Sequence, residues 1–479
     1  MNKKKISCAL LTVMLATTIS FPMTGCSQTT KTSQSQVVIN NEDTSKTVKT
    51  QVEDDTVYVS FKEACEYIGG KCEVNGKEAI ATVGEDTIKV NGDSKDAEFN
   101  SKKIEMTKEA KIIKDGIYVP ISFLNEVFNA RVTFDKENKV LNIRTEMPLK
   151  YAKNFSVKYL RNGIKKVTDA EKRVLILVPE GKEVPEEFKN EIVINTPIKD
   201  VLLGSTTEAC LLRPINELGS IKAVTTKEEN WQIPEVKQGL KDGKITYVGS
   251  SKNPDYEKIA SIKPQMAFVY TGPSGEQSMI EKFKELNINY AVNNEYLEEN
   301  PFGRMEWMKF MAAFYNKEEE AEKYFNEAVK KVEEASEKLP KDNKPTVAWG
   351  LISKGQVFTP KADSYVAKMI ELAGGDYVFK EPGTGNAKIG LEDFYAQAKD
   401  ASLFMYASST TYAPTLKSVL EKGPALENLK AVKDKNTWCF APDYYQSIDK
   451  TDDLIIQLME IIHPKDGETE KITHYVKYE

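Results

Sequence analysis

The chain has 479 residues, which is too long for a single hydrophobic core, so two or three domains are expected. Its formal charge of −6 and the lack of a basic stripe exclude a typical nucleic-acid partner. Only His463 and His474 supply imidazole, and both lie near the C-terminus, which restricts the metal and acid–base chemistry of the chain.

Residues 1–25 have the pattern of a signal peptide. Three lysines at positions 3–5 precede an apolar stretch over 6–23 that is short for a membrane span. The stretch ends in MTGC at 23–26, which resembles a lipoprotein signal. The resemblance implies that Cys26 is cleaved free and acylated. An ordinary secretory signal with an incidental cysteine is the alternative.

Residues 26–50 are rich in Ser, Thr, Gln and Lys, which predicts a disordered tether. A lipid on Cys26 followed by a tether predicts a protein that is anchored to a membrane without spanning it. We therefore expect the chain on the extracellular face of the cell membrane, in a Gram-positive organism.

A repeat occupies residues 51–146. The segment DTVYV at 55–59 returns 60 positions later as DGIYV at 115–119, and the offset holds onward. Each copy predicts a short strand, a helix and a hairpin of alternating apolar residues. In this alignment Cys65 falls opposite Asn125, which predicts an exposed cysteine and disfavours a disulfide with Cys72.

The second copy of the repeat resembles the copper amine oxidase N-terminal-like "stalk" domain, through DGIYVP at 115–120 and VTFD at 132–135. The resemblance implies no copper site, and the segment contains no histidine. We expect a rigid stalk. A spacer that binds the cell wall is the alternative.

From 170 the pattern becomes α/β. RVLILVP at 173–179 predicts a strand covered on both faces, and a Gly-Ser-Thr-Thr loop at 204–207 opens a helix expected over 208–218. Residues 170–300 are therefore predicted to form one α/β lobe, the N-lobe. Residues 340–479 are predicted to form a second, the C-lobe.

The stretch 301–339 joins the two predicted lobes. Apolar residues recur there at steps of three and four, which predicts an amphipathic helix. Asn316 followed by acidic residues 318–320 predicts a break and a new helix start. The later piece, 317–338, would be about 33 Å long and act as the strut, while 304–315 would belong to the first lobe.

Four segments together resemble the periplasmic binding proteins for iron–siderophores, haem and vitamin B12. They are NPDYEKIASIKPQ at 253–265, FGRMEW at 302–307, DSYVAKMIELAGG at 363–375 and LEDFYA at 391–396. The resemblance implies two α/β lobes joined by one long helix, a ligand held between them, and delivery to the permease dimer of an ABC importer.

The same resemblance implies one permease-docking glutamate on each lobe, which by position are Glu257 and Glu392. Each would grip an arginine cluster on the permease in a charge-assisted clasp. The alternative is that both carboxylates only stabilise the starts of their helices.

The carboxyl ends of the predicted strands give the candidate ligand site, because open α/β sheets bind ligands there. Its aromatic, cationic and hydroxyl side chains suit a flat or amphipathic ligand with carboxylates or catecholates, although any single aromatic residue is as readily explained by core packing. The candidates are Thr206, Thr207, Trp231, Tyr270, Arg304, Ser353, Lys354, Ser409, Tyr444 and Tyr445. Arg213 is predicted to be structural.

Bare zinc or manganese is disfavoured as the ligand because such sites need several histidines. We expect no metal site and no resident cofactor, and a metal chelate as cargo. An iron–siderophore is favoured, with haem and a corrinoid such as cobalamin left open. The chain lacks the common hydrolase, zinc-protease and nucleotide-binding motifs, so we expect no enzyme. Two alternatives are a bilobed chelatase and a stalked cell-surface receptor or wall-binding lipoprotein that is not coupled to transport.

Overall fold

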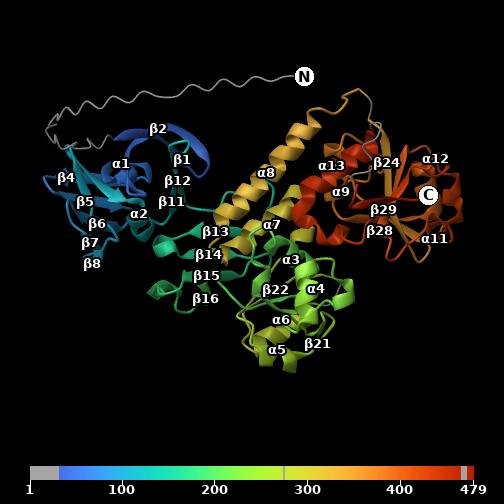
Figure 1. Cartoon of the computed structure of the whole chain (residues 1–479), viewed down its shortest axis with the longest axis horizontal. Helices are drawn as coiled ribbons and strands as arrows, with labels where there is room; N and C mark the ends of the chain where they lie inside the picture. The colour runs from blue at the N-terminus through green and yellow to red at the C-terminus, as the bar shows by residue number, and fades with distance from the viewer. Residues whose placement is uncertain (1–31, 273–275, 343, 465–471) are drawn as a thin grey trace, which may run out of the picture.

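The computed structural model describes residues 32–272, 276–342, 344–464 and 472–479. Figure 1 shows a β-rich body (the stalk) on the left, an N-lobe at the centre and below, and a C-lobe on the right. Helix α8 (Glu318–Ser336) runs between these bodies. The predicted fold class, two α/β lobes joined by a long helix behind an α+β repeat, is confirmed. In the described part of the chain, no helix is both long and apolar enough to span a membrane.

The stalk contains the predicted repeat. The first copy is β3 (Thr56–Ser60), α1 (Phe61–Tyr67), β4 (Lys71–Asn75) and β5 (Glu78–Val83), and the second copy is β10 (Gly116–Pro120), α2 (Ile121–Val127), β11 (Arg131–Asp135) and β12 (Val140–Arg144). Strands β3 and β10 pair antiparallel, with Val59 opposite Val119, so the two copies share one sheet. The other strands of the stalk are β1 (Ser33–Ile39), β2 (Glu42–Glu53), β6 (Asp86–Asn91), β7 (Asp96–Phe99), β8 (Lys102–Glu105) and β9 (Lys111–Ile113). They complete a seven-stranded sheet, β11-β12-β1-β2-β3-β10-β9, and a five-stranded meander, β4-β5-β6-β7-β8.

The prediction of a disordered tether over 26–50 is wrong from residue 33 onward. Strands β1 and β2 occupy that stretch and lie at the centre of the seven-stranded sheet. Polar composition misled the prediction, because two of the hydroxyl residues are buried as a pair: Ser35 Oγ and Thr50 Oγ1 are 2.7 Å apart. A buried hydroxyl with a partner costs little, so a polar strand can still enter a core. Residues 26–31 lie outside the described part.

The prediction that Cys65 is exposed is also wrong. Cys65 is fully buried on the face of α1 that packs against β4 and β5. Its counterpart Asn125 is only half-buried, and its side chain bonds both the N–H and the C=O of Val132. The two copies therefore use this helix position differently, for a thiol in the core and for an amide that holds a strand.

The N-lobe begins earlier than residue 170. Strands β13 (Ser156–Tyr159) and β14 (Lys165–Thr168) form a four-stranded sheet with β15 (Val174–Pro179) and β16 (Ile192–Thr196). The alternation of buried Phe155, Val157 and Tyr159 is a period-two strand signal that the sequence prediction missed.

A second, all-parallel sheet forms the centre of the N-lobe. Its order is β19-β18-β17-β22-β23. The strands are β17 (Val201–Leu203), β18 (Ile221–Val224), β19 (Thr246–Tyr247), β22 (Met266–Val269) and β23 (Tyr290–Val292). The helices are α3 (Thr206–Leu212), α4 (Pro234–Lys241), α5 (Tyr256–Ile262), α6 (Glu276–Glu285) and α7 (Pro301–Ala313). Helix α3 ends well before the predicted Leu218, because Pro214 has no N–H with which to continue the helical hydrogen bonds.

The predicted helix break is confirmed. Helices α7 and α8 are separated at Asn316, whose φ is 59°, a left-handed conformation that asparagine tolerates. Helix α7 is buried on almost every side and packs Trp307 and Phe310 against Phe155, which places it inside the N-lobe as expected. Only α8 serves as the strut.

The C-lobe repeats the α/β plan. Its mixed sheet has a parallel centre, in which β24 lies between β26 and β28, and β28 pairs β29. The strands are β24 (Thr346–Ser353), β25 (Gln356–Pro360), β26 (Asp376–Tyr377), β27 (Asn386–Gly390), β28 (Leu403–Ser409), β29 (Thr437–Phe440) and β30 (Tyr475–Lys477). The helices are α9 (Tyr365–Leu372), α10 (Leu391–Ala398), α11 (Leu416–Leu420), α12 (Lys430–Lys433) and α13 (Thr451–Ile462).

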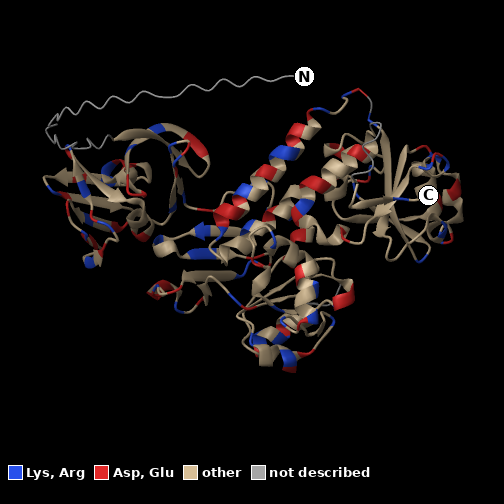
Figure 2. Cartoon of the chain, viewed as in Figure 1, with Lys and Arg blue, Asp and Glu red and all other residues tan. Residues whose placement is uncertain are grey.

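The stalk is docked on the N-lobe and on the strut. Figure 2 shows an acidic band at the end of α8 that faces the stalk. There, Arg144 of the stalk makes a two-pronged pair with Glu322 at 2.5 and 2.9 Å, and Arg131 pairs with Glu319 at 3.0 Å. Bidentate arginine–carboxylate pairs fix orientation as well as distance, so the stalk meets the strut in a defined geometry.

Candidate functional site: the cleft between the lobes

Two adjoining cavities lie between the N-lobe and the C-lobe. The smaller has a volume of 180 Å³ and the larger 400 Å³, and both are lined by Arg304 and Tyr365. The smaller is also lined by Thr206, Thr207, Pro301, Met369, Tyr444, Tyr445, Ile448, Thr451 and Leu454. The larger extends along Tyr296, Leu297, Glu298, Glu299, Pro360, Ser364, Val366, Thr384, Gly385 and Asn386. The shared pair makes them parts of one cleft.

The N-lobe wall lies at the switch point of its parallel sheet. Strand β17 lies between β18 and β22, so the chain first builds the sheet on one side of β17, through β18 and β19, and then on the other side, through β22 and β23. Helix α3 starts just beyond the carboxyl end of β17. Ser205 caps α3 by accepting the N–H of Thr207 at 3.3 Å, while Glu208 accepts the N–H of Ser205 at 3.1 Å. This capping box holds Thr206 and Thr207 at the edge where open α/β sheets bind ligands.

Arg304 stands where the two cavities meet. Its Nε donates to a Glu295 carboxylate oxygen at 2.7 Å, and its guanidinium lies 4.3 Å from the centre of the Tyr365 ring. Although burial opposes the charge, Glu295 and Tyr365 hold the pKa of Arg304 above its ordinary value. Among the described residues, Nε is the only donor of this guanidinium with a hydrogen-bond partner, and the side chain lines both cavities.

The C-lobe wall is aromatic. Tyr444 is buried and stacks on Phe440 with ring centres 3.8 Å apart, whereas Tyr445 is 51% exposed and turns toward the cleft. Burial raises the pKa of both phenols, and the neighbouring Tyr365 adds to the effect. Both tyrosines are therefore neutral at physiological pH and offer ring faces and O–H groups.

A contact between buried His474 and half-buried Asp443 supports this wall from behind. His474 Nδ1 lies 2.8 Å from a carboxylate oxygen of Asp443, the residue before Tyr444. Burial alone would raise the pKa of Asp443, but the hydrogen bond and charge of His474 lower it. His474 thus helps to hold the turn that carries the two tyrosines.

The other predicted site residues lie outside the two cavities. Trp231 is buried in the N-lobe core, where its indole N–H donates to the carbonyl of Thr226 at 3.0 Å. Tyr270 packs edge-on against Tyr296, which itself lines the larger cavity. Ser353 and Lys354 lie at the turn of the β24–β25 hairpin, and Ser409 is buried at the end of β28.

Tyr365 lines both cavities but is absent from the predicted site residues. It begins α9 directly after Ser364, whose side chain accepts the N–H of Ala367. Asp-Ser-Tyr is an N-cap signal, and in the C-lobe it follows strand β25 much as Ser205 follows β17. Thr206 is predicted because it begins a helix that follows a strand of the N-lobe. The same criterion, applied to the C-lobe, would have identified Tyr365.

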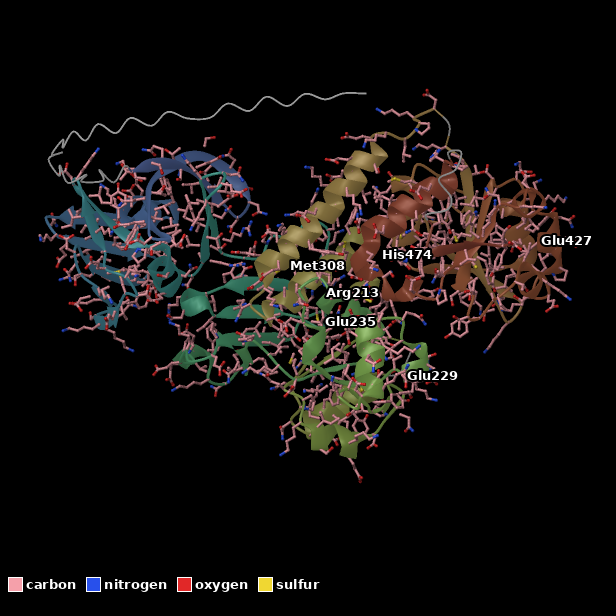
Figure 3. All side chains as sticks on the ribbon, viewed as in Figure 1. Arg213, Glu229, Glu235, Met308, Glu427 and His474 are labelled. Carbon is pink, nitrogen blue, oxygen red and sulfur yellow. The ribbon has the colours of Figure 1, made fainter. Side chains whose placement is uncertain are left out.

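Arg213 ties the lobes together beside the cleft, as its structural assignment predicted. Its Nε and Nη2 donate to the two carboxylate oxygens of Asp449 at 2.8 and 2.6 Å. Gln446 adds two bonds of 2.8 Å to the backbone of the N-lobe, at Asn230 and Gln232. Figure 3 shows Arg213 where the two lobes meet, with His474 nearby in the C-lobe.

Glu257 and Glu392 occupy equivalent places in the two lobes. Each lies in the first turn of a helix, α5 and α10, that leads into a parallel strand, β22 and β28. Both side chains are exposed, and neither makes an ion pair with any other described residue. In the same described ranges, no three His, Cys, Asp or Glu side chains are grouped so that they could hold a metal ion.

Comparison with known proteins agrees with this architecture. Residues 207–438 match the family described as periplasmic binding protein, and residues 38–143 match the copper amine oxidase N-terminal domain. A chain of Methanocaldococcus jannaschii named "Uncharacterized lipoprotein MJ0878" is 38% identical over 387 residues, 74% of this chain and 92% of that one. A second, "Uncharacterized lipoprotein MJ0872", is 29% identical over 62% of this chain and 78% of its own length.

Among solved structures, a periplasmic binding protein from Veillonella parvula is 20% identical with a TM-score of 0.47, over 56% of this chain and 92% of that one. The family match and the relative that is 38% identical over most of its length decide the classification. The chain therefore belongs to the periplasmic binding proteins, a family of solute-binding proteins, and carries a copper amine oxidase N-terminal domain in front of its binding lobes.

Proposed function

We propose that this protein captures a metal chelate in the cleft between its lobes and delivers it to the permease dimer of an ABC importer. An iron–siderophore is the favoured ligand, and haem or a corrinoid fits the same cleft chemistry. The observation that carries the proposal is the cleft wall itself, in which Tyr365, Tyr444 and Tyr445 face Arg304 and the hydroxyls of Thr206 and Thr207. Ring faces beside one guanidinium suit a flat, partly anionic ligand.

Lipidation of Cys26 on the extracellular face of the membrane is part of the proposal. Cys26 lies outside the described residues, and the support comes from the MTGC sequence and from relatives named as lipoproteins. Replacing Cys26 with serine is expected to release the protein from the membrane fraction while leaving ligand affinity unchanged. That the cell is Gram-positive stays a prediction.

Ligand binding is tested with residues 32–479 and four probes: a ferric catecholate, a ferric hydroxamate, haemin and cyanocobalamin. We expect one of them to quench tryptophan fluorescence saturably at micromolar concentration. Tyr445→Ala should weaken that binding at least tenfold, about 1.4 kcal/mol, because it removes an exposed ring from the cleft. Lys354→Ala, at a hairpin turn outside both cavities, is the matched control and should change Kd less than twofold. Saturable binding of none of the four probes would exclude this ligand class.

Docking is tested by reversing charges on the lobes. Glu257→Arg or Glu392→Arg should lower the rate of ligand uptake at least tenfold with Kd unchanged, because each removes one of two charged grips and repels arginine on the permease. Glu235→Arg and Glu427→Arg are the controls. Both glutamates are exposed in the first turns of other helices, one on each lobe, and both are labelled in Figure 3.

If all four charge-reversal variants import ligand at the wild-type rate, the docking roles are wrong. A protein that binds its ligand but supports no import even as wild type would favour the stalked receptor that is not coupled to transport.

The stalk is proposed as a spacer that orients the lobes. No described stalk residue lines either cavity of the cleft. Deletion of residues 32–146 is therefore expected to change Kd by less than tenfold and to lower the melting temperature of the lobes, because Glu319 and Glu322 lose their arginine partners. A larger loss of affinity would show that the stalk helps to form the site.

A further inference from the structure

Two cysteines of the stalk meet inside its core. Cys65 lies on α1 and Cys72 on β4, and the tight turn between them is closed by the N–H of Gly70, which donates to the carbonyl of Cys65 at 2.9 Å. Gly69 in that turn has a φ of 85°, which favours glycine. Both side chains lie in the same buried cluster of the stalk and α1 packs directly on β4, so the turn places the two thiols close together.

The two thiols have unequal surroundings. Cys65 is fully buried, while Cys72 keeps 8% of its surface exposed at the edge of the five-stranded sheet. The nearby Cys65 thiol lowers the pKa of Cys72, and the charge of Lys62 lowers it further against the effect of burial. The nearby Cys72 thiol, together with burial, raises the pKa of Cys65. Cys72 is therefore the more reactive thiol and the one that a reagent reaches first.

The remaining described cysteines provide an internal comparison. Cys210 and Cys439 are buried separately in the N-lobe and the C-lobe, and Cys210 donates to the carbonyl of Thr206 at 3.3 Å. Neither has a thiol neighbour among the described residues. A metal is not an alternative for the stalk pair, because the described residues offer it no third His, Cys, Asp or Glu ligand.

We propose that Cys65 and Cys72 form a reversible disulfide that locks the stalk, by exchange with a small-molecule disulfide. The Cys72 thiolate attacks one sulfur of the reagent, which forms a mixed disulfide and releases one thiol. Cys65 then gives up its proton and attacks Sγ of Cys72, which releases the second thiol. The two protein thiols are oxidised and the reagent is reduced to two thiols, so electrons and protons balance.

The bond would join the two sheets of the stalk. Helix α1 packs against the seven-stranded sheet through residues that include Phe61, and β4 is the first strand of the meander. A link between α1 and β4 therefore holds the meander to the rest of the domain. Disulfides persist outside the cytoplasm, where the periplasmic binding family works.

Peptide mapping tests the bond directly. The folded full chain is incubated with oxidised glutathione, its free thiols are alkylated, and it is digested with trypsin. Cleavage after Lys71 separates peptide 63–71, which contains Cys65, from peptide 72–77, which contains Cys72. We expect these two peptides to be recovered joined, lighter by two hydrogen atoms than their sum, and separated by dithiothreitol. Cys210 and Cys439 should be recovered alkylated after unfolding.

Single variants separate the roles of the two thiols. Cys65→Ser should stop the exchange at a glutathione adduct on Cys72, while Cys72→Ser should react at least tenfold more slowly than the wild type. The double control C210S/C439S should give the same joined peptide as the wild type. Peptides 63–71 and 72–77 recovered separately alkylated, or a persistent glutathione adduct on the wild-type chain, would overturn the proposal.

The lock itself is tested by the thermal transition of the stalk. Oxidation should raise the midpoint by at least about 5 °C in the wild type and leave it unchanged in Cys72→Ser. A joined peptide without any rise in the midpoint would overturn the claim that the bond stabilises the domain.

Discussion

Glu306→Leu is expected to destabilise the N-lobe by about 4 kcal/mol or more. Glu306 is fully buried in α7, and its carboxylate accepts the N–H groups of Lys150, Tyr151 and Ala152 at 2.8 to 3.1 Å. It also accepts from the buried ammonium of Lys309 at 2.7 Å. Leucine would leave three donors unsatisfied and one buried charge unpaired, and the loss of one partner of such a pair alone costs about 3–5 kcal/mol.

The measurement is urea unfolding followed by the fluorescence of Trp307, which packs in the same core. Glu299→Leu is the control, because Glu299 is exposed and pairs with Lys153 at the surface, so its loss should cost less than about 1 kcal/mol. Adding Lys309→Met to Glu306→Leu should restore part of the loss but not all, because the three backbone donors remain without an acceptor. Equal stability of Glu306→Leu and Glu299→Leu would contradict this account of the segment that links stalk and lobe.

Arg213→Met should loosen the contact between the lobes and cost about 3–5 kcal/mol at pH 7. The change leaves the carboxylate of Asp449 buried without its bidentate partner. The Arg213–Asp449 pair lies beside the smaller cavity. Ligand affinity should therefore also fall, because a smaller fraction of the molecules has the two lobes in the arrangement that forms the cleft. Lys331→Met is the matched control. It removes a half-exposed ammonium of α8 that pairs with Asp452 and Asp453 of α13, and it should cost about 1 kcal/mol.

The pH dependence of this variant has a definite sign. Burial raises the pKa of Asp449 above its ordinary value of 3.8, and Arg213 opposes that shift. An acid with a raised pKa in the folded state binds its proton more readily there than in the unfolded chain, so stability falls as pH rises through that range. Without Arg213 the pKa of Asp449 rises further, so the pH range over which stability falls extends to higher pH. The loss caused by Arg213→Met should therefore be smaller near pH 4 than at pH 7, and a loss independent of pH would show that Asp449 does not carry it.

The elements that the sequence predicts well are those governed by local rules. The break at Asn316 follows from a residue that tolerates left-handed backbone and from three acids that suit a helix start. The repeat in the stalk follows from a constant 60-residue register, which the structure reproduces in α1 and α2. Thr206 and Tyr445 follow from the rule that ligands bind at the carboxyl ends of strands.

The failures are of tertiary origin. Ser35 and Thr50 look like a tether until β1 and β2 bring their hydroxyls together in the core. Cys65 looks exposed by alignment with Asn125, but side-chain burial depends on which sheet each helix packs against. Trp231 follows a strand as a cleft residue would, yet its ring fills the N-lobe core. In each case the contacts that bury the side chain come from residues distant in sequence, so no local sequence pattern predicts them.

The strands that replace the expected tether change the height at which the cleft is held. With the lipid on Cys26, as proposed, only six peptide steps separate the bilayer from Thr32, and six residues reach at most about 22 Å. Distance from the membrane is then set mainly by the folded stalk and by its pairing with α8, not by a length of loose chain. The lobes would sample a shallow layer above the bilayer, which raises their effective concentration at any permease embedded in it.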